Sequence, residues 1–164
     1  MKAMITVLAL FAFVPLAQAA VVGEEVRYMA GDTQMKGYMA WVNAIAGKRP
    51  GILVVHEWWG HNDYARKRAN MLAEQGYTAL AVDMYGDGKT ASHPDDAGKF
   101  AGEVRKNMDV AEARFNAAME ALASNVTVNP DQISAIGYCF GGGVVLAMAR
   151  RGADLDLVAS FHGS

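Results

Sequence analysis

The sequence predicts an α/β fold: a mostly parallel β-sheet with helices on both faces. Short apolar runs typical of buried strands alternate with longer segments whose apolar residues recur at helical spacing. The chain has 164 residues, 52% of them hydrophobic, which is enough for one buried core. Its net charge is −2, and no basic run is present, which argues against a nucleic-acid-binding protein. One cysteine excludes an intrachain disulfide.

Residues 1–19 predict a secretory signal peptide rather than a part of the fold. Lys2 precedes an apolar stretch that ends in the small-residue pattern Ala17-Gln18-Ala19. The stretch is shorter than the roughly 20 residues of a membrane-spanning helix. We therefore expect a domain over residues 20–164 that is secreted or periplasmic and has no stable membrane anchor after cleavage. A buried N-terminal helix is the alternative.

The first half of the domain predicts a hairpin followed by a strand–helix–strand unit. Four segments have the composition of strands: residues 25–29, 35–42, 51–55 and 78–84. Gly31-Asp32 predicts the hairpin turn. The continuous apolar run 51–55 is typical of a strand covered on both faces. Residues 63–75 predict a helix that Gly76 ends.

The second half predicts a loop, a long helix and a second strand–helix–strand unit. Glycine, aspartate and proline over residues 85–97 predict the loop, and helical spacing over 99–124 predicts one amphipathic helix. The remaining segments predict a turn at 129–131, a strand at 133–138, a helix at 140–151 and a strand within 155–161.

One motif carries a specific chemistry, the sequence GYCFGGG at residues 137–143. It has the G-x-nucleophile-x-G spacing with Cys139 in the nucleophile position, between a predicted strand and a predicted helix. Gly137 and Gly141 lack the Cβ atoms that would clash across so sharp a turn. The positive end of the following helix favours a thiolate, and the Phe140 backbone N–H is placed to bind an oxyanion. The alternative is that Cys139 is a small buried apolar residue.

Three stretches resemble the dienelactone hydrolase family of α/β-hydrolases: VVHEWWG at 54–60, AVDMYG at 81–86 and GYCFGG at 137–142. The resemblance runs from about residue 21 to the last residue and implies the α/β-hydrolase fold. It also implies a cysteine nucleophile that attacks the carbonyl of an ester or lactone and forms an acyl-enzyme, which water then hydrolyses. No cofactor and no metal are implied.

The resemblance assigns roles to residues around Cys139. Glu57 is implied to contact the resting thiol and to help deprotonate it, and the Trp58 backbone N–H is implied to be the second oxyanion donor beside that of Phe140. Trp59 and Tyr85 are candidates to line the pocket. Glu57 as a solvated loop carboxylate, and the two tryptophans as plain packing residues, remain alternatives.

The sequence departs from the family pattern in two places. The arginine that usually follows Asp-x-Tyr is absent, and Lys89 offers only a point charge there. The family also implies an acid and then a histidine after the nucleophile, but only Asp154, Asp156 and His162 follow Cys139. We expect the two aspartates at the wrong edge of the sheet and His162 as a pocket-lining or structural residue, with proton transfer by His162 as the alternative. The C-terminal strands of the fold are therefore expected to be missing from this chain.

The sequence thus predicts an exported hydrolase that acts on a small-molecule ester or lactone. A non-catalytic exported binding protein or pseudo-enzyme on the same fold is the alternative, because the expected acid and base are not found. A redox sensor would need a second cysteine. His93 and the two aspartates that follow Pro94 lack the spacing of a metal site and predict a solvated loop, and His56 and His61 are not expected to be ligands.

Overall fold

A computed structural model describes residues 20–163; the predicted signal peptide at 1–19 and residue 164 lie outside the described residues. The elements are β1 Val21–Ala30, β2 Thr33–Val42, β3 Arg49–Val55, α1 Asp63–Glu74, β4 Thr78–Val82, α2 Pro94–Lys106, α3 Met108–Ala123, β5 Val128–Tyr138, α4 Phe140–Arg150 and β6 Leu157–Phe161. Every predicted strand is present, and most of the strands extend by a few residues beyond their apolar runs.

The strands form one sheet in the order β1-β2-β4-β3-β5-β6. β1 and β2 are the predicted antiparallel hairpin, and β2 also pairs antiparallel with β4. The other pairings, β3 with β4, β3 with β5 and β5 with β6, are parallel. The prediction of a mostly parallel sheet is therefore confirmed.

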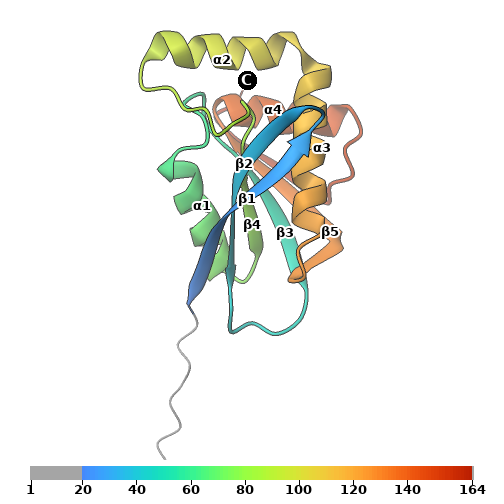
Figure 1. Ribbon diagram of the computed structural model, residues 1–164. Coiled ribbons are helices and arrows are strands. Elements are labelled where there is room, and N and C mark those ends of the chain that lie inside the picture. The colour runs from blue at the N-terminus through green and yellow to red at the C-terminus, as the bar shows by residue number, and fades with distance from the viewer. Residues whose placement is uncertain (1–19, 164) are drawn as a thin grey trace, which may run out of the picture.

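Helices cover both faces of this sheet, as the sequence predicts. The residues of β3 alternate between two apolar clusters, because successive side chains of a strand point to opposite faces. Leu53 and Val55 pack with buried residues of α3 and α4, whereas Ile52 and Val54 pack with the alanines of α1. Figure 1 shows α1 and α3 on opposite sides of the strands, with α2 lying across one end of them.

The prediction of a single helix over 99–124 is wrong, and so is the prediction of a loop through residue 97. Two helices occupy this region, and α2 begins at Pro94. They are separated at Asn107, whose φ of −130° and ψ of 79° are not helical. The Asn107 side chain accepts a hydrogen bond from the Val110 N–H and so caps α3. His93 caps α2 in the same way by accepting from the Asp95 N–H.

The predicted turn at 129–131 lies inside β5 rather than before it. The pairing of β5 with β3 shifts there, so that Asn129 faces Pro50 but Ile133 faces the next residue, Gly51. The extra residues form a bulge, in which the Asn129 side chain accepts from the Asp131 N–H. The turn residues are thus correctly predicted, and the strand continues on both sides of them.

The carboxyl ends of four parallel strands meet at one edge of the sheet. Val55 at the end of β3 pairs with Val82 of β4 on one side and with Gly137 of β5 on the other. Gly137 in turn pairs with Ser160 of β6. The residues that follow these strands therefore emerge side by side, where open α/β sheets place their ligand sites. No helix within residues 20–163 is long and apolar enough to cross a membrane.

Candidate active site

Cys139 occupies a single-residue turn between β5 and α4. Its backbone has φ 52° and ψ −115°, in a region that side-chain-bearing residues rarely adopt. Its side chain makes no capping hydrogen bond to α4 and is partly exposed. This is the sharp, strained strand-to-helix turn on which a G-x-nucleophile-x-G cysteine is presented.

The two glycines of the motif are required by close backbone contacts. A Cβ on Gly137 would lie 2.1 Å from the Gly141 carbonyl oxygen. A Cβ on Gly141 would lie 2.4 Å from the carbonyl oxygen of Val55 and 2.6 Å from that of His56. The first residues of α4 are therefore packed directly against the end of β3, which brings Cys139 next to the loop that carries Glu57.

The backbone N–H groups of Trp58 and Phe140, the two predicted oxyanion donors, have no hydrogen-bond acceptor among residues 20–163. The N–H of Phe140 is at the first position of α4, where no intrahelical acceptor exists. The N–H of Cys139 itself is not free, because it donates to the Phe161 carbonyl oxygen at 3.0 Å. The predicted oxyanion role requires N–H groups that are not already bonded, and these two meet that requirement among the described residues.

Glu57 and His162 come together at this edge from β3 and β6. The His162 Nε2 lies 3.4 Å from the Glu57 Oε1, and the Glu57 side chain is only 29% exposed, whereas that of His162 is 65% exposed. The pairing follows from the register of the parallel strands, which places the residue after β6 beside those after β5 and β3. His162 also has a left-handed backbone, with φ 45°.

His56 is buried and fixes the backbone of the loop that holds Glu57. Its Nε2 accepts a hydrogen bond from the Met84 N–H at 3.2 Å, so the ring proton is on Nδ1, which lies 2.5 Å from the Glu57 carbonyl oxygen. Its ring packs edge-on against Tyr85 and stacks on Phe140. Burial lowers the pKa of His56 to about 4, so the imidazole is neutral at pH 7.

Asp83 organises the neighbouring loop. Its carboxylate is fully buried and accepts hydrogen bonds from four backbone N–H groups, those of Lys36, Tyr85, Gly86 and Gly88. Four donors satisfy the buried charge and tie the loop after β4 to β2. The Asp-Met-Tyr segment therefore has a structural aspartate, and that aspartate positions Tyr85.

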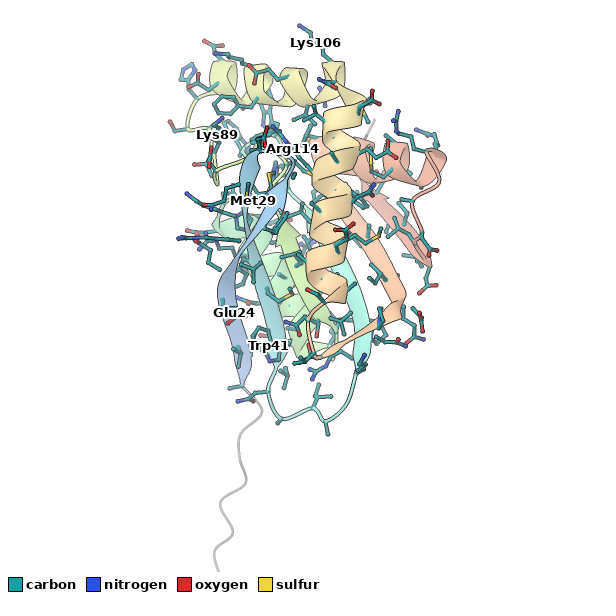
Figure 2. All side chains as sticks on the ribbon, turned by 45° about the vertical axis from the view of Figure 1, so that its right-hand side comes forward. Glu24, Met29, Trp41, Lys89, Lys106 and Arg114 are labelled. Carbon is teal, nitrogen blue, oxygen red and sulfur yellow. The ribbon has the colours of Figure 1, made fainter. Side chains whose placement is uncertain are left out.

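Tyr85 connects the two loops and lines a cavity. Its hydroxyl donates to the Trp58 carbonyl oxygen at 2.9 Å, which fixes the residue whose N–H is the second predicted oxyanion donor. Burial raises the pKa of Tyr85, so the phenol remains neutral. The cavity, of about 220 Å³, is lined by Tyr85, Lys89, Phe100, Glu103, Val104, Asn107, Val110 and Arg114. Figure 2 shows Lys89 and Arg114 below α2.

Trp59 lies outside that cavity lining. Its carbonyl oxygen accepts from the Ala91 N–H, which joins the two loops, and its ring packs edge-on against that of Trp58. Asp154 and Asp156 lie at the other end of β6, where the Asp156 N–H donates to the Ile133 carbonyl oxygen. No group of three or more metal-ligating side chains occurs within residues 20–163.

Several residues of the site were not predicted from the sequence. The roles of His56 and Asp83 depend on hydrogen bonds to residues 28 and 47 positions away. Arg114 lies on a helix face of otherwise ordinary amphipathic spacing, yet it donates to the Met84 carbonyl oxygen at 2.7 Å and reaches the Tyr85 cavity. The only local indication of these roles is Asp83 with Gly86 and Gly88 shortly after it, a pattern typical of a loop held by side-chain-to-backbone hydrogen bonds.

Known proteins are similar in sequence to most of this chain. The chain is 32% identical over 149 residues to the usf protein of Aquifex pyrophilus, an alignment that covers 86% of this chain and 62% of that protein. It is 28% identical over 141 residues to a Synechocystis protein named for carboxymethylenebutenolidase activity, covering 81% and 55% of the two chains. The chain thus spans about three fifths of the length of these relatives.

Solved structures have the same overall fold as this chain. The structure titled m3DLH superposes with a TM-score of 0.85 at 37% identity, covering 88% of this chain and 60% of the other. The dienelactone hydrolase-like promiscuous phosphotriesterase P91 from metagenomic libraries gives 0.84 at 35% identity, with the same coverage. The profile described as the dienelactone hydrolase family matches residues 35–164. The fold is therefore that of the α/β-hydrolases, and the chain belongs to the dienelactone hydrolase family.

Proposed function

We propose that the chain carries the nucleophile and oxyanion site of a hydrolase for small esters or lactones, with Cys139 as the nucleophile. The observation that carries the proposal is the left-handed backbone of Cys139 at the junction of β5 and α4. An unfavourable backbone conformation persists only where the surrounding packing imposes it, and such residues cluster at functional sites. Family membership supports the same chemistry.

The reaction follows from the groups at the sheet edge. The Cys139 thiol gives its proton to the Glu57 carboxylate, and the thiolate attacks the carbonyl carbon of the substrate. The N–H groups of Trp58 and Phe140 stabilise the tetrahedral oxyanion. Its collapse breaks the bond from carbon to the leaving oxygen, which takes up the proton held on Glu57 and leaves a thioester on Cys139. Water then hydrolyses the thioester and restores the thiol.

The proposal is tested by the burst of product that appears when an acyl-enzyme forms faster than water hydrolyses it. With p-nitrophenyl acetate, we expect a burst of p-nitrophenol of one equivalent per chain, with one acetyl group on Cys139 detected by mass spectrometry. The Cys139→Ala variant should show neither. An unchanged burst in Cys139→Ala would contradict the proposal and favour a non-catalytic role for the fold.

The role of Glu57 is tested through the reactivity of the thiol. Because Cys139 is the only cysteine, the rate of iodoacetamide labelling reports on this residue alone. We expect Glu57→Gln to slow labelling near pH 7 by about tenfold or more, because an amide cannot take up the thiol proton as the sulfur attacks. The matched control is Glu24→Gln, an exposed carboxylate on β1 away from α2 (Figure 2). Equal rates in the two variants would assign Glu57 to a solvated loop role.

We also propose that the chain is exported and that cleavage follows Ala19. Support comes from the charged start, the apolar stretch and the small-residue pattern at residues 17–19. Expression in a bacterium with an export system should yield a secreted or periplasmic protein whose N-terminal residue is Ala20. Recovery of the chain with Met1 intact in the cytoplasm would contradict this proposal without affecting the proposed chemistry.

A further inference from the structure

We infer that His162 is a positioning residue that holds the Glu57 carboxylate at the edge of the sheet that carries Cys139. The inference rests on the proposed roles of Cys139 and Glu57. It assigns to the residue after β6 a part in activating the thiol, although this residue exchanges no proton in the proposed step.

The backbone of His162 has a positive φ, as that of Cys139 has. Within residues 20–163, the non-glycine residues with positive φ are Asp87, Cys139 and His162. Two of these three directly follow the neighbouring parallel strands β5 and β6. A left-handed backbone is unfavourable for a residue with a side chain. His162 is thus held in place by its surroundings, as Cys139 is.

The contacts that hold His162 lead to the nucleophile turn. On one side, the Phe161 carbonyl oxygen accepts from the Cys139 N–H. On the other side, Gly163 packs against Gly142 of α4 so closely that a Cβ on Gly163 would lie 2.5 Å from the Gly142 carbonyl carbon. The backbone before and after His162 is therefore fixed to Cys139 and to the first turn of α4. The direction in which the His162 side chain leaves the backbone is fixed by the same contacts.

The fixed backbone directs the imidazole toward Glu57. The His162 Nε2 lies 3.4 Å from the Glu57 Oε1. The Glu57 backbone is already tied down, because its carbonyl oxygen accepts from the Gly60 N–H and lies against the His56 Nδ1. Only the carboxylate end of the Glu57 side chain is left free to rotate. Among residues 20–163, the charged or polar side chain within ion-pair distance of this carboxylate is that of His162. Holding it in one orientation favours transfer of the thiol proton.

The test is the rate of iodoacetamide labelling of Cys139 in variants of the whole chain. Because the contact uses Nε2, Gln at position 162 places an amide nitrogen near the same point, whereas Asn reaches only as far as Nδ1. Asn also tolerates a left-handed backbone. We expect His162→Asn to slow labelling about two- to fivefold, the range for a largely exposed pair, and His162→Gln to restore most of the rate. The exposed His93→Gln variant is the control and should label at the wild-type rate.

A double-mutant cycle separates positioning from a general structural effect. If His162 acts through Glu57, then His162→Asn should cause no further slowing once Glu57→Gln is present. Equal slowing by His162→Asn with and without the Glu57 carboxylate would overturn the inference, and so would a wild-type rate in His162→Asn. Unfolding midpoints within a few degrees of wild type show that each variant is folded.

The same measurements distinguish this inference from the proposed function. Slow labelling in Glu57→Gln together with unchanged labelling in His162→Asn would overturn the inference and leave the roles of Cys139 and Glu57 intact. A p-nitrophenol burst that persists in Cys139→Ala would instead remove the proposed function on which the inference rests.

Discussion

At the scale of single residues, the turn that holds Cys139 depends on the absence of side chains at two neighbouring positions. Gly137 and Gly141 allow the backbones of β5, α4 and β3 to approach within distances that no Cβ permits. Their spacing around Cys139 was visible in the sequence, and the predicted strand–turn–helix is present. What the spacing did not reveal is that the close neighbour of Gly141 is β3, because that contact joins segments about 85 residues apart in the chain.

This contact predicts that Gly141→Ala strongly destabilises the protein. The added methyl group would meet two backbone carbonyl oxygens, which cannot move without separating α4 from β3. We expect the free energy of unfolding to fall by at least about 2 kcal/mol, measured by urea denaturation.

The control for Gly141→Ala is Gly102→Ala in α2, where an added Cβ meets nothing within 4 Å. There we expect stabilisation of about 0.5–1 kcal/mol, because alanine is the better helix former. A loss of stability in Gly102→Ala equal to that in Gly141→Ala would show that the close contact is not the cause.

At the scale of elements, the boundary between α2 and α3 shows how a capping residue overrides helical spacing. Apolar residues continue at helical intervals on both sides of Asn107, and the spacing alone predicts one helix. The break lets α2 turn away and pack Phe100 against Tyr85 and Arg105 over the Phe140 ring. A continuous helix could not make these contacts and follow α3 along the sheet, so tertiary packing selects the capped form.

The cap predicts a moderate effect of Asn107→Ala. Removing the side chain leaves the Val110 N–H without its acceptor, and we expect the free energy of unfolding to fall by about 1 kcal/mol. Asn107→Asp keeps an acceptor at the same place and should retain stability within a few tenths of a kcal/mol, as aspartate and asparagine are similar N-caps. Urea denaturation measures both. Similar losses in the two variants would assign the effect to the Tyr85 cavity, which Asn107 also lines, rather than to the cap.

At the scale of the whole molecule, two buried histidines make stability depend on pH. Burial lowers the pKa of His56 to about 4, and it lowers the pKa of His61 to about 4 as well, where the charges of His56 and Arg66 act in the same direction. In the unfolded chain the two histidines have pKa values near 6.5. As the pH falls, they are therefore protonated in the unfolded state before they are protonated in the folded state. The stability that the neutral rings contribute is present above pH 6.5 and is lost toward pH 4.

Replacing one of these histidines should therefore flatten the pH dependence. As the pH falls from 7.5 to 5, protonation of each of these histidines in the unfolded state lowers the free energy of unfolding by about 2 kcal/mol. We expect His61→Phe to reduce the wild-type loss over that interval by about this amount, in urea denaturation at the two pH values. The exposed His93→Gln variant should show the wild-type loss. An unchanged pH dependence in His61→Phe would mean that His61 titrates normally in the folded protein.

The sequence by itself determined the strands, the α1 and α4 helices, the family and the strand–turn–helix motif around Cys139. These follow from local patterns: apolar runs, helical spacing and glycines at fixed distances from Cys139. Only the tertiary structure decided the break at Asn107, the structural roles of His56 and Asp83, the reach of Arg114 to the Tyr85 cavity, and the contact between Glu57 and His162. Each of these depends on which strands are neighbours and in what register, and that is fixed by the packing of the whole sheet rather than by any one segment.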